Sequence, residues 1–112
     1  MRSQGSRFIV LDMKTIASWD QFDAALAIMR SHERKARAAR MFVLNATPLL
    51  NRLGKATGAC RWGSKRHTAA LAEFQPVSVA VARAEREATR RDFVVRGLAA
   101  RLEAYDAARK AA

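Results

Sequence analysis

From Trp19 to about residue 45, apolar residues recur at the spacing of one helix face. Neither Gly nor Pro interrupts residues 18–47, and Ser18 with Gln21 matches a capping box at the start of this stretch. We therefore predict a long helix over about residues 19–45, with Trp19 in the core beside the first stripe positions. The stripe consists of Phe22, Leu26, Met29, Ala36, Ala39 and Val43.

A second apolar seam runs through the C-terminal part of the chain at alternating steps of four and three. It predicts a helix over about residues 77–109, in which Gly97 would let another backbone approach closely. Arg91 is the charged exception, either at a seam edge or in a register-setting helix contact. The seam begins at Val77, and its members assigned to contact with another protein or a second copy are Val81, Ala84, Ala88, Val95, Leu98, Leu102 and Tyr105.

Between these two patterns the sequence contains helix breakers. TPLLNRLG at 47–54 predicts a short helix that begins at a proline and ends at a glycine. The glycines of KATGACRWGS at 55–64 predict a loop, and the serine that follows them caps a further short helix broken by Pro76. The predicted fold is all-α, a small helical bundle with two long helices and a basic middle of short helices and loop.

The length of 112 residues fits one domain, which we place at residues 18–112 after an extended leader at 1–17. Half of the residues are apolar, but 24 of them are Ala, so the predicted core is thin. The basic, acid-free start could begin an organellar import signal, or Met13 could be the true initiator; otherwise we expect a cytoplasmic protein. No apolar run reaches membrane-spanning length, and we expect no membrane insertion.

Charge changes this picture, because the net charge of +11 is concentrated in one block. Residues 30–67 contain ten basic side chains and the single acid Glu33, which gives a net charge of +9. Residues 1–29 have a net charge of zero, and residues 68–112 have a net charge of +2. A solvated helix normally mixes both signs, so we expect this block to contact a polyanion, nucleic acid first. The candidate nucleic-acid-binding residues are Arg30, Arg34, Lys35, Arg37, Arg40, Arg52, Lys55, Arg61, Trp62, Lys65 and Arg66.

Trp62 has two interpretations. Its position between two glycines and among cations is typical of proteins that stack aromatic rings on unpaired bases. Alternatively the indole packs into the core and pins the loop, which a chain with only two Trp and few bulky core residues slightly favours.

The remaining chemically active side chains support neither a metal site nor catalysis. Cys60 and His67 lie seven residues apart, but the chain has no second Cys and no carboxylate between residues 34 and 72. His32 is the only other histidine, and we expect it at a helix surface or boundary. We therefore predict no catalytic residue, no metal, no cofactor and no enzymatic activity.

The leading hypothesis is a small helical subunit of a ribonucleoprotein or nucleoprotein assembly that contacts the phosphate backbone of DNA or RNA. One alternative is a helix-turn-helix DNA-binding regulator of plasmid or phage type, with short helices within residues 47–71, although their connection is long for that motif. Another is an inhibitor, adaptor or peripheral subunit that docks on an acidic or nucleic-acid-binding protein surface.

Overall fold

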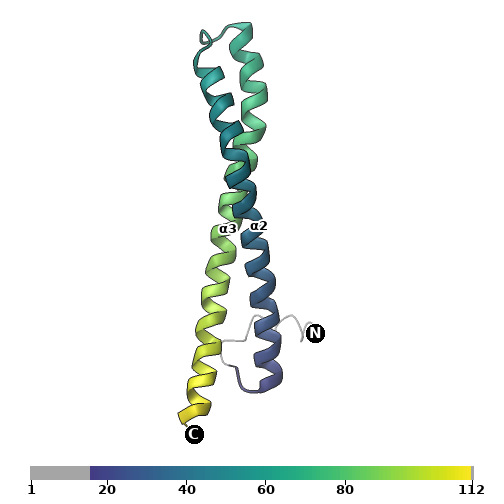
Figure 1. Cartoon of the computed structure of the whole chain (residues 1–112), viewed down its shortest axis with the longest axis vertical. Coiled ribbons are helices and arrows are strands. Elements are labelled where there is room, and N and C mark those ends of the chain that lie inside the picture. Colours follow the sequence, from purple (N-terminus) through teal and green to yellow (C-terminus); the bar gives the residue numbers. More distant parts are fainter. Residues whose placement is uncertain (1–15, 112) are drawn as a thin grey trace, which may run out of the picture. The chain divides into compact units, whose positions relative to one another are not determined.

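The structure is a computed structural model that describes residues 16–111 of the chain. Two helices, α2 (Trp19–Gly58) and α3 (Lys65–Ala111), contain nearly all of these residues, and no strand occurs among them (Figure 1). The chain is therefore all-α, as predicted. The proposed leader and the question of the initiator methionine concern residues that, apart from 16 and 17, lie outside the described part.

Both helices extend beyond their predicted ends, and the separate short helices predicted in the middle are wrong. Pro48 and Pro76 lie inside α2 and α3. The hydroxyl of Thr47 donates to the carbonyl of Val43 at 2.6 Å, within one helix, instead of capping a new one. The described residues thus form two long helices instead of a bundle of several. Helix stability in proteins comes mainly from packing of an apolar face, so a continuing seam can outweigh a proline.

The predicted caps at both helix starts are confirmed. The Ser18 hydroxyl oxygen accepts the backbone N–H of Gln21 at 3.2 Å, and the Gln21 side chain accepts the N–H of Ala17 at 2.7 Å. At α3, the Ser64 hydroxyl oxygen accepts the N–H of His67 at 3.1 Å. Each cap satisfies a backbone donor that the first helical turn leaves unpaired.

Contacts divide the chain into two units, each built from a segment of α2 and an antiparallel segment of α3. Unit 1 is Met1–Arg34 with Arg91–Ala112, and unit 2 is Lys35–Arg90. The core of unit 1 consists of buried Ile16, Ala25, Leu98 and Leu102, against which Phe22, Leu26, Ile28, Met29, Val94 and Tyr105 pack.

Trp19 lies at the edge of unit 1. The sequence-based prediction that Trp19 is in the core is therefore wrong. Its side chain is 47% exposed. The indole still contacts the rings of Phe22 and Tyr105 edge-on, with centroids 5.1 and 5.3 Å away, and the Arg109 guanidinium lies 4.4 Å from its centroid. Trp19 therefore covers the end of the core with one side of its ring and faces solvent with the other.

Arg91, the charged seam residue, makes a polar contact between the helices of unit 1. A guanidinium nitrogen lies 2.9 Å from Nδ1 of His32, and both residues are half-buried. Of the two interpretations of Arg91, the structure therefore supports the helix contact. His32 correspondingly lies at the boundary between the core and the surface of α2.

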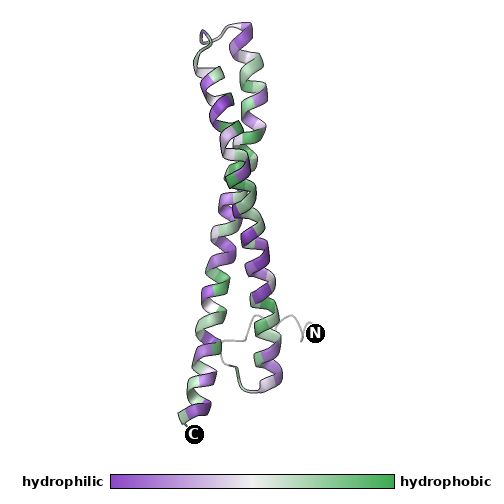
Figure 2. Cartoon of the chain, viewed as in Figure 1, coloured by the Kyte–Doolittle hydropathy of each residue, from purple (hydrophilic) through white to green (hydrophobic). Residues whose placement is uncertain are grey.

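Unit 2 is packed through small side chains. Its buried residues are Ala36, Thr57, Val81 and Ala88, and the Thr57 hydroxyl is satisfied by the Leu53 carbonyl at 2.8 Å. No large side chain is fully buried anywhere in residues 16–111. Hydrophilic colour accordingly alternates with hydrophobic colour along both helices (Figure 2).

The apolar seam of α3 packs against other parts of the same chain. Four of the seven residues assigned to contact with another protein are buried in one or other unit, and the other three are half-buried. The four buried side chains are not available to a partner in this structure, whereas the three half-buried ones are partly exposed, so the predicted partner interface stays a prediction. The buried four are Val81, Ala88, Leu98 and Leu102, and the half-buried three are Ala84, Val95 and Tyr105.

Candidate nucleic-acid interface

All eleven residues that the sequence assigned to nucleic-acid binding are exposed. The structure places two of them, Arg30 and Arg34, in unit 1 and the other nine in unit 2. Those of unit 2 form two groups, one along α2 and one around the connection to α3.

The α2 group of unit 2 consists of five cations on exposed positions of one helix. Arg40 already interacts with another group of the chain. The other four have no ion pair with a carboxylate among residues 16–111. Glu33, four residues before Arg37, is the nearest acid on α2, and the sequence has none from residue 34 to 72, so most of this charge is not neutralised by neighbours on α2. The group is Lys35, Arg37, Arg40, Arg52 and Lys55.

The second group surrounds the turn that joins the helices. Arg61 and Trp62 lie in the turn, and Lys65 and Arg66 occupy the first positions of α3. Trp62 is 86% exposed, so of its two interpretations the one that packs it into the core is wrong. Its ring lies beside that of His67, with centroids 5.9 Å apart and planes tilted by 39°. An exposed indole thus lies among three exposed cations.

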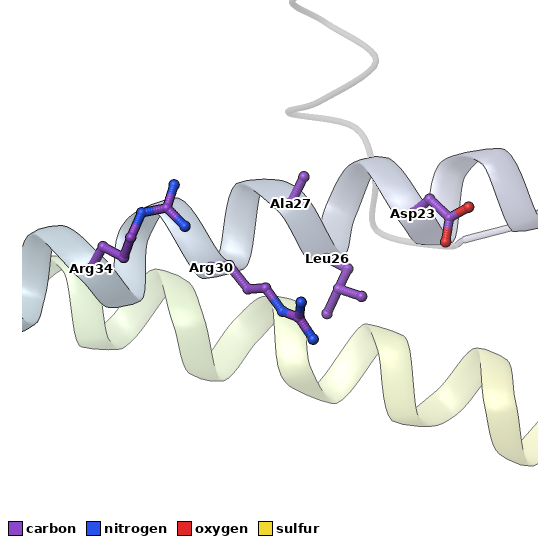
Figure 3. A pocket seen from close by; sticks show the side chains of 5 residues that line it. All are labelled: Asp23, Leu26, Ala27, Arg30 and Arg34. Carbon is purple, nitrogen blue, oxygen red and sulfur yellow. The ribbon is translucent and has the colours of Figure 1, made fainter.

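The unit 1 pair, Arg30 and Arg34, lies beside a shallow hollow of about 310 Å³ along α2 (Figure 3). The Arg30 side chain extends toward Leu26 and α3, whereas Arg34 points away from α3. Asp23 and Ala27 complete the lining. Because a carboxylate shares this hollow, it is a less favourable place for an anion than the cationic groups of unit 2.

The sequence analysis missed an exposed apolar surface on α2 within unit 2. Leu44 is 65% exposed, and three other large side chains of the same stretch also face solvent. Figure 2 shows strong hydrophobic colour along this part of α2. The signal was present in MFVL at 41–44, because only Val43 of these four belongs to the predicted stripe. We call this set the α2 apolar surface: Met41, Phe42, Leu44 and Leu49.

Cys60 and His67 contact backbone and ring groups of neighbouring residues in the chain. Cys60 lies with its sulfur 3.2 Å from the Ala56 carbonyl, one helical turn earlier. His67 follows the Ser64 cap and lies against Trp62. Within residues 16–111, no three metal-binding side chains come together.

Neither α2 nor α3 contains an uninterrupted apolar stretch suited to crossing a membrane. Comparison of the chain with protein-family models, with curated proteins and with solved structures gives no match.

Proposed function

We propose that this protein is a non-enzymatic nucleic-acid-binding subunit that contacts the phosphate backbone through eight cations of unit 2, namely the α2 group together with Arg61, Lys65 and Arg66. The observation that carries the proposal is the exposure of eight cations between residues 35 and 66, a stretch that contains no acidic residue. Four cations of the α2 group have no ion pair with a carboxylate among residues 16–111, so their charge remains available to an external anion. Guanidinium groups also match phosphate oxygens in a two-pronged geometry.

The proposed binding is non-specific in sequence. The cations are on the sides of long helices and at the turn between them, and such contacts fix the position of a backbone without reading base edges. A helix-turn-helix regulator is less well supported, because residues 47–71, which would supply its two short helices, belong to long α2, the turn and long α3.

Membership of a larger assembly finds support in the α2 apolar surface. Four large apolar side chains are exposed within about two and a half helical turns; Met41, Phe42 and Leu49 share one side of the helix, whereas Leu44 faces another. Cations lie before and after them on α2, for example Arg37 and Arg52. A protein partner with an apolar centre and an acidic rim would match this surface in both respects.

The salt dependence of binding tests the proposal. Affinity for a labelled duplex and a labelled single strand is measured by fluorescence anisotropy between about 50 and about 200 mM sodium chloride. We expect a linear fall of log K with log salt, with a slope of several units, because each phosphate contact releases a condensed counterion. An affinity that stays flat over this range for both ligands would overturn the proposal.

A pair of double variants locates the site. Arg52→Gln with Lys55→Gln removes two charges from the α2 group, and we expect the slope to fall by about 1.5 units. Arg83→Gln with Arg86→Gln removes the same charge from exposed positions of α3 next to Glu85 and serves as the matched control. Equal losses in both variants would contradict the assignment to the α2 group.

The alternative of a protein that docks only on another protein is favoured by the same α2 apolar surface. Phe42→Gln with Leu44→Gln distinguishes the two functions, because it alters apolar side chains and no charge. Purification of parent and variant from native cells, with and without nuclease, gives the comparison. A partner that survives nuclease and is lost from the variant, together with an affinity for nucleic acid that stays flat with salt, supports docking alone, whereas release by nuclease supports the proposed function.

A further inference from the structure

Trp62 differs from the other tryptophan of the chain in how little the protein covers it. The indole of Trp19 has three ring or cation contacts and is 47% exposed, whereas that of Trp62 contacts His67 and is 86% exposed. A large apolar ring left in water loses the free energy that burial would provide. Its position therefore calls for a ligand that can cover it.

The turn holds this indole in a defined place. The N–H of Ser64 donates to the carbonyl of Arg61 at 3.0 Å, which closes a turn with Trp62 and Gly63 in the middle. Gly63 has φ of 82°, the value of the third residue of a type II turn. The N–H of Cys60 donates to the Thr57 carbonyl at 3.2 Å, so the turn is also tied to the end of α2.

Charge around the turn specifies the ligand. Arg61, Lys65 and Arg66 are exposed beside Trp62, and the nearest acids in the sequence are Glu33 and Glu73. A ligand that covers the ring and satisfies these cations must combine a flat aromatic face with phosphate groups. In a duplex the base faces are stacked on one another, whereas in a single strand they are free.

We propose that Trp62 is a stacking platform for an unpaired base, so that the ligand class of the turn is single-stranded nucleic acid. The inference rests on the proposed function for its backbone contacts and adds a preference to it. Stacking of one base on an aromatic ring changes affinity about five-fold to a hundred-fold when the ring is removed. Every base has an aromatic face, so the preference concerns strandedness and not sequence.

The experiment compares single strands with a duplex of equal length. Oligo(dT), oligo(U) and a mixed-sequence duplex, each of about 20 nucleotides per strand, are titrated at about 100 mM salt. We expect Trp62→Ala to lose about ten-fold in affinity for the single strands and less than two-fold for the duplex. Trp62→Phe keeps most of the affinity, whereas Trp62→Leu, which is apolar without an aromatic face, behaves like Trp62→Ala.

Fluorescence gives a second readout. In a Trp19→Phe background Trp62 is the only tryptophan. We expect its emission to be quenched by the single strands and little changed by the duplex. Single-strand affinity of Trp62→Ala within two-fold of the parent, restoration by Trp62→Leu, or unchanged emission would each overturn the inference. Because Trp62 is exposed, circular dichroism of the variants should match the parent.

The outcome separates this inference from the proposed function. Salt-dependent binding of both ligands with no effect of Trp62→Ala removes the stacking platform and leaves backbone binding in place. Absence of salt-dependent binding to any of the three ligands removes the proposed function itself, and with it the stacking platform.

Discussion

Gly63 and Gly97 differ in whether their backbone conformation requires glycine. Gly63 has a φ of 82°, in the left-handed region that residues with a Cβ adopt only at a cost. Gly97 lies in the interior of α3, where a Cβ would meet no atom within 4 Å. The sequence interpretation that Gly97 lets another backbone come close is therefore not supported by the described residues. Gly63 therefore provides the positive φ that its turn requires, whereas Gly97 lowers the helix propensity of α3.

Substitution of each glycine by alanine should change stability in opposite directions. We expect Gly63→Ala to lower the free energy of unfolding by about 1 kcal/mol through backbone strain. Gly97→Ala should raise it by about 0.5–1 kcal/mol through helix propensity. Urea denaturation followed by circular dichroism measures both. Gly63→Asn, which tolerates positive φ better, should fall between Gly63→Ala and the parent; an equal loss for both would contradict the strain argument.

The contact between His32 and Arg91 should contribute as a pair. The guanidinium donates to Nδ1 of His32, which requires the neutral ring with its other nitrogen protonated. Since both residues also interact elsewhere, single variants mix several effects. A double-mutant cycle with His32→Ala and Arg91→Ala isolates the pair, and we expect a coupling of about 1 kcal/mol in chemical denaturation. Additive losses would show that the contact contributes nothing.

At the residue scale, the sequence predicted local chemistry better than exposure. Ser18 and Ser64 were recognised as caps because a cap depends on groups within three residues of itself. The surroundings of Trp19 and Trp62 depend on which side chains from distant parts of the chain cover each ring. No local pattern contains that information, and for both indoles the core placement was wrong.

At the scale of elements, the two helix prolines are the feature that local rules misjudge. Pro48 and Pro76 are exposed, and each removes one helical hydrogen bond. Val43 and Leu50, on either side of the first proline, are both half-buried, so the packed face of α2 continues through it. The heptad seam of α3 was predicted correctly in its spacing, while its start was placed too late because Pro76 was taken as a break.

Replacement of a helix proline should therefore stabilise the protein. We expect Pro76→Ala to raise the free energy of unfolding by about 1–3 kcal/mol, because the proline ring is exposed and the backbone regains an N–H donor. The neighbouring exposed change Gln75→Ala is the matched control and should stay within about 0.5 kcal/mol of the parent. Thermal and urea unfolding give both values. A loss of stability in Pro76→Ala would mean that the ring makes a favourable contact.

For the whole molecule, the sequence was most informative about charge. The ten charged candidate residues are all exposed, as a binding role requires, because charged side chains are rarely buried and residues 30–67 offer them almost no acid to pair with. Their distribution between the two units could not be read from the sequence, since it depends on which segments of α2 and α3 pack together. The α2 apolar surface, by contrast, could have been suspected from the sequence, because Met41, Phe42 and Leu44 lie outside the predicted stripe.

The concentrated positive charge should give salt opposite effects on folding and on binding. Residues 30–67 have a net charge of +9, so their mutual repulsion destabilises the folded protein at low ionic strength. Between about 20 and about 200 mM sodium chloride, screening should raise the melting temperature by about 2–5 °C, while affinity for nucleic acid falls. A triple variant, Arg37→Gln, Arg52→Gln and Lys55→Gln, reduces the repulsion and should melt at a temperature less dependent on salt. An equal salt response in parent and variant would show that the stabilisation does not arise from this block.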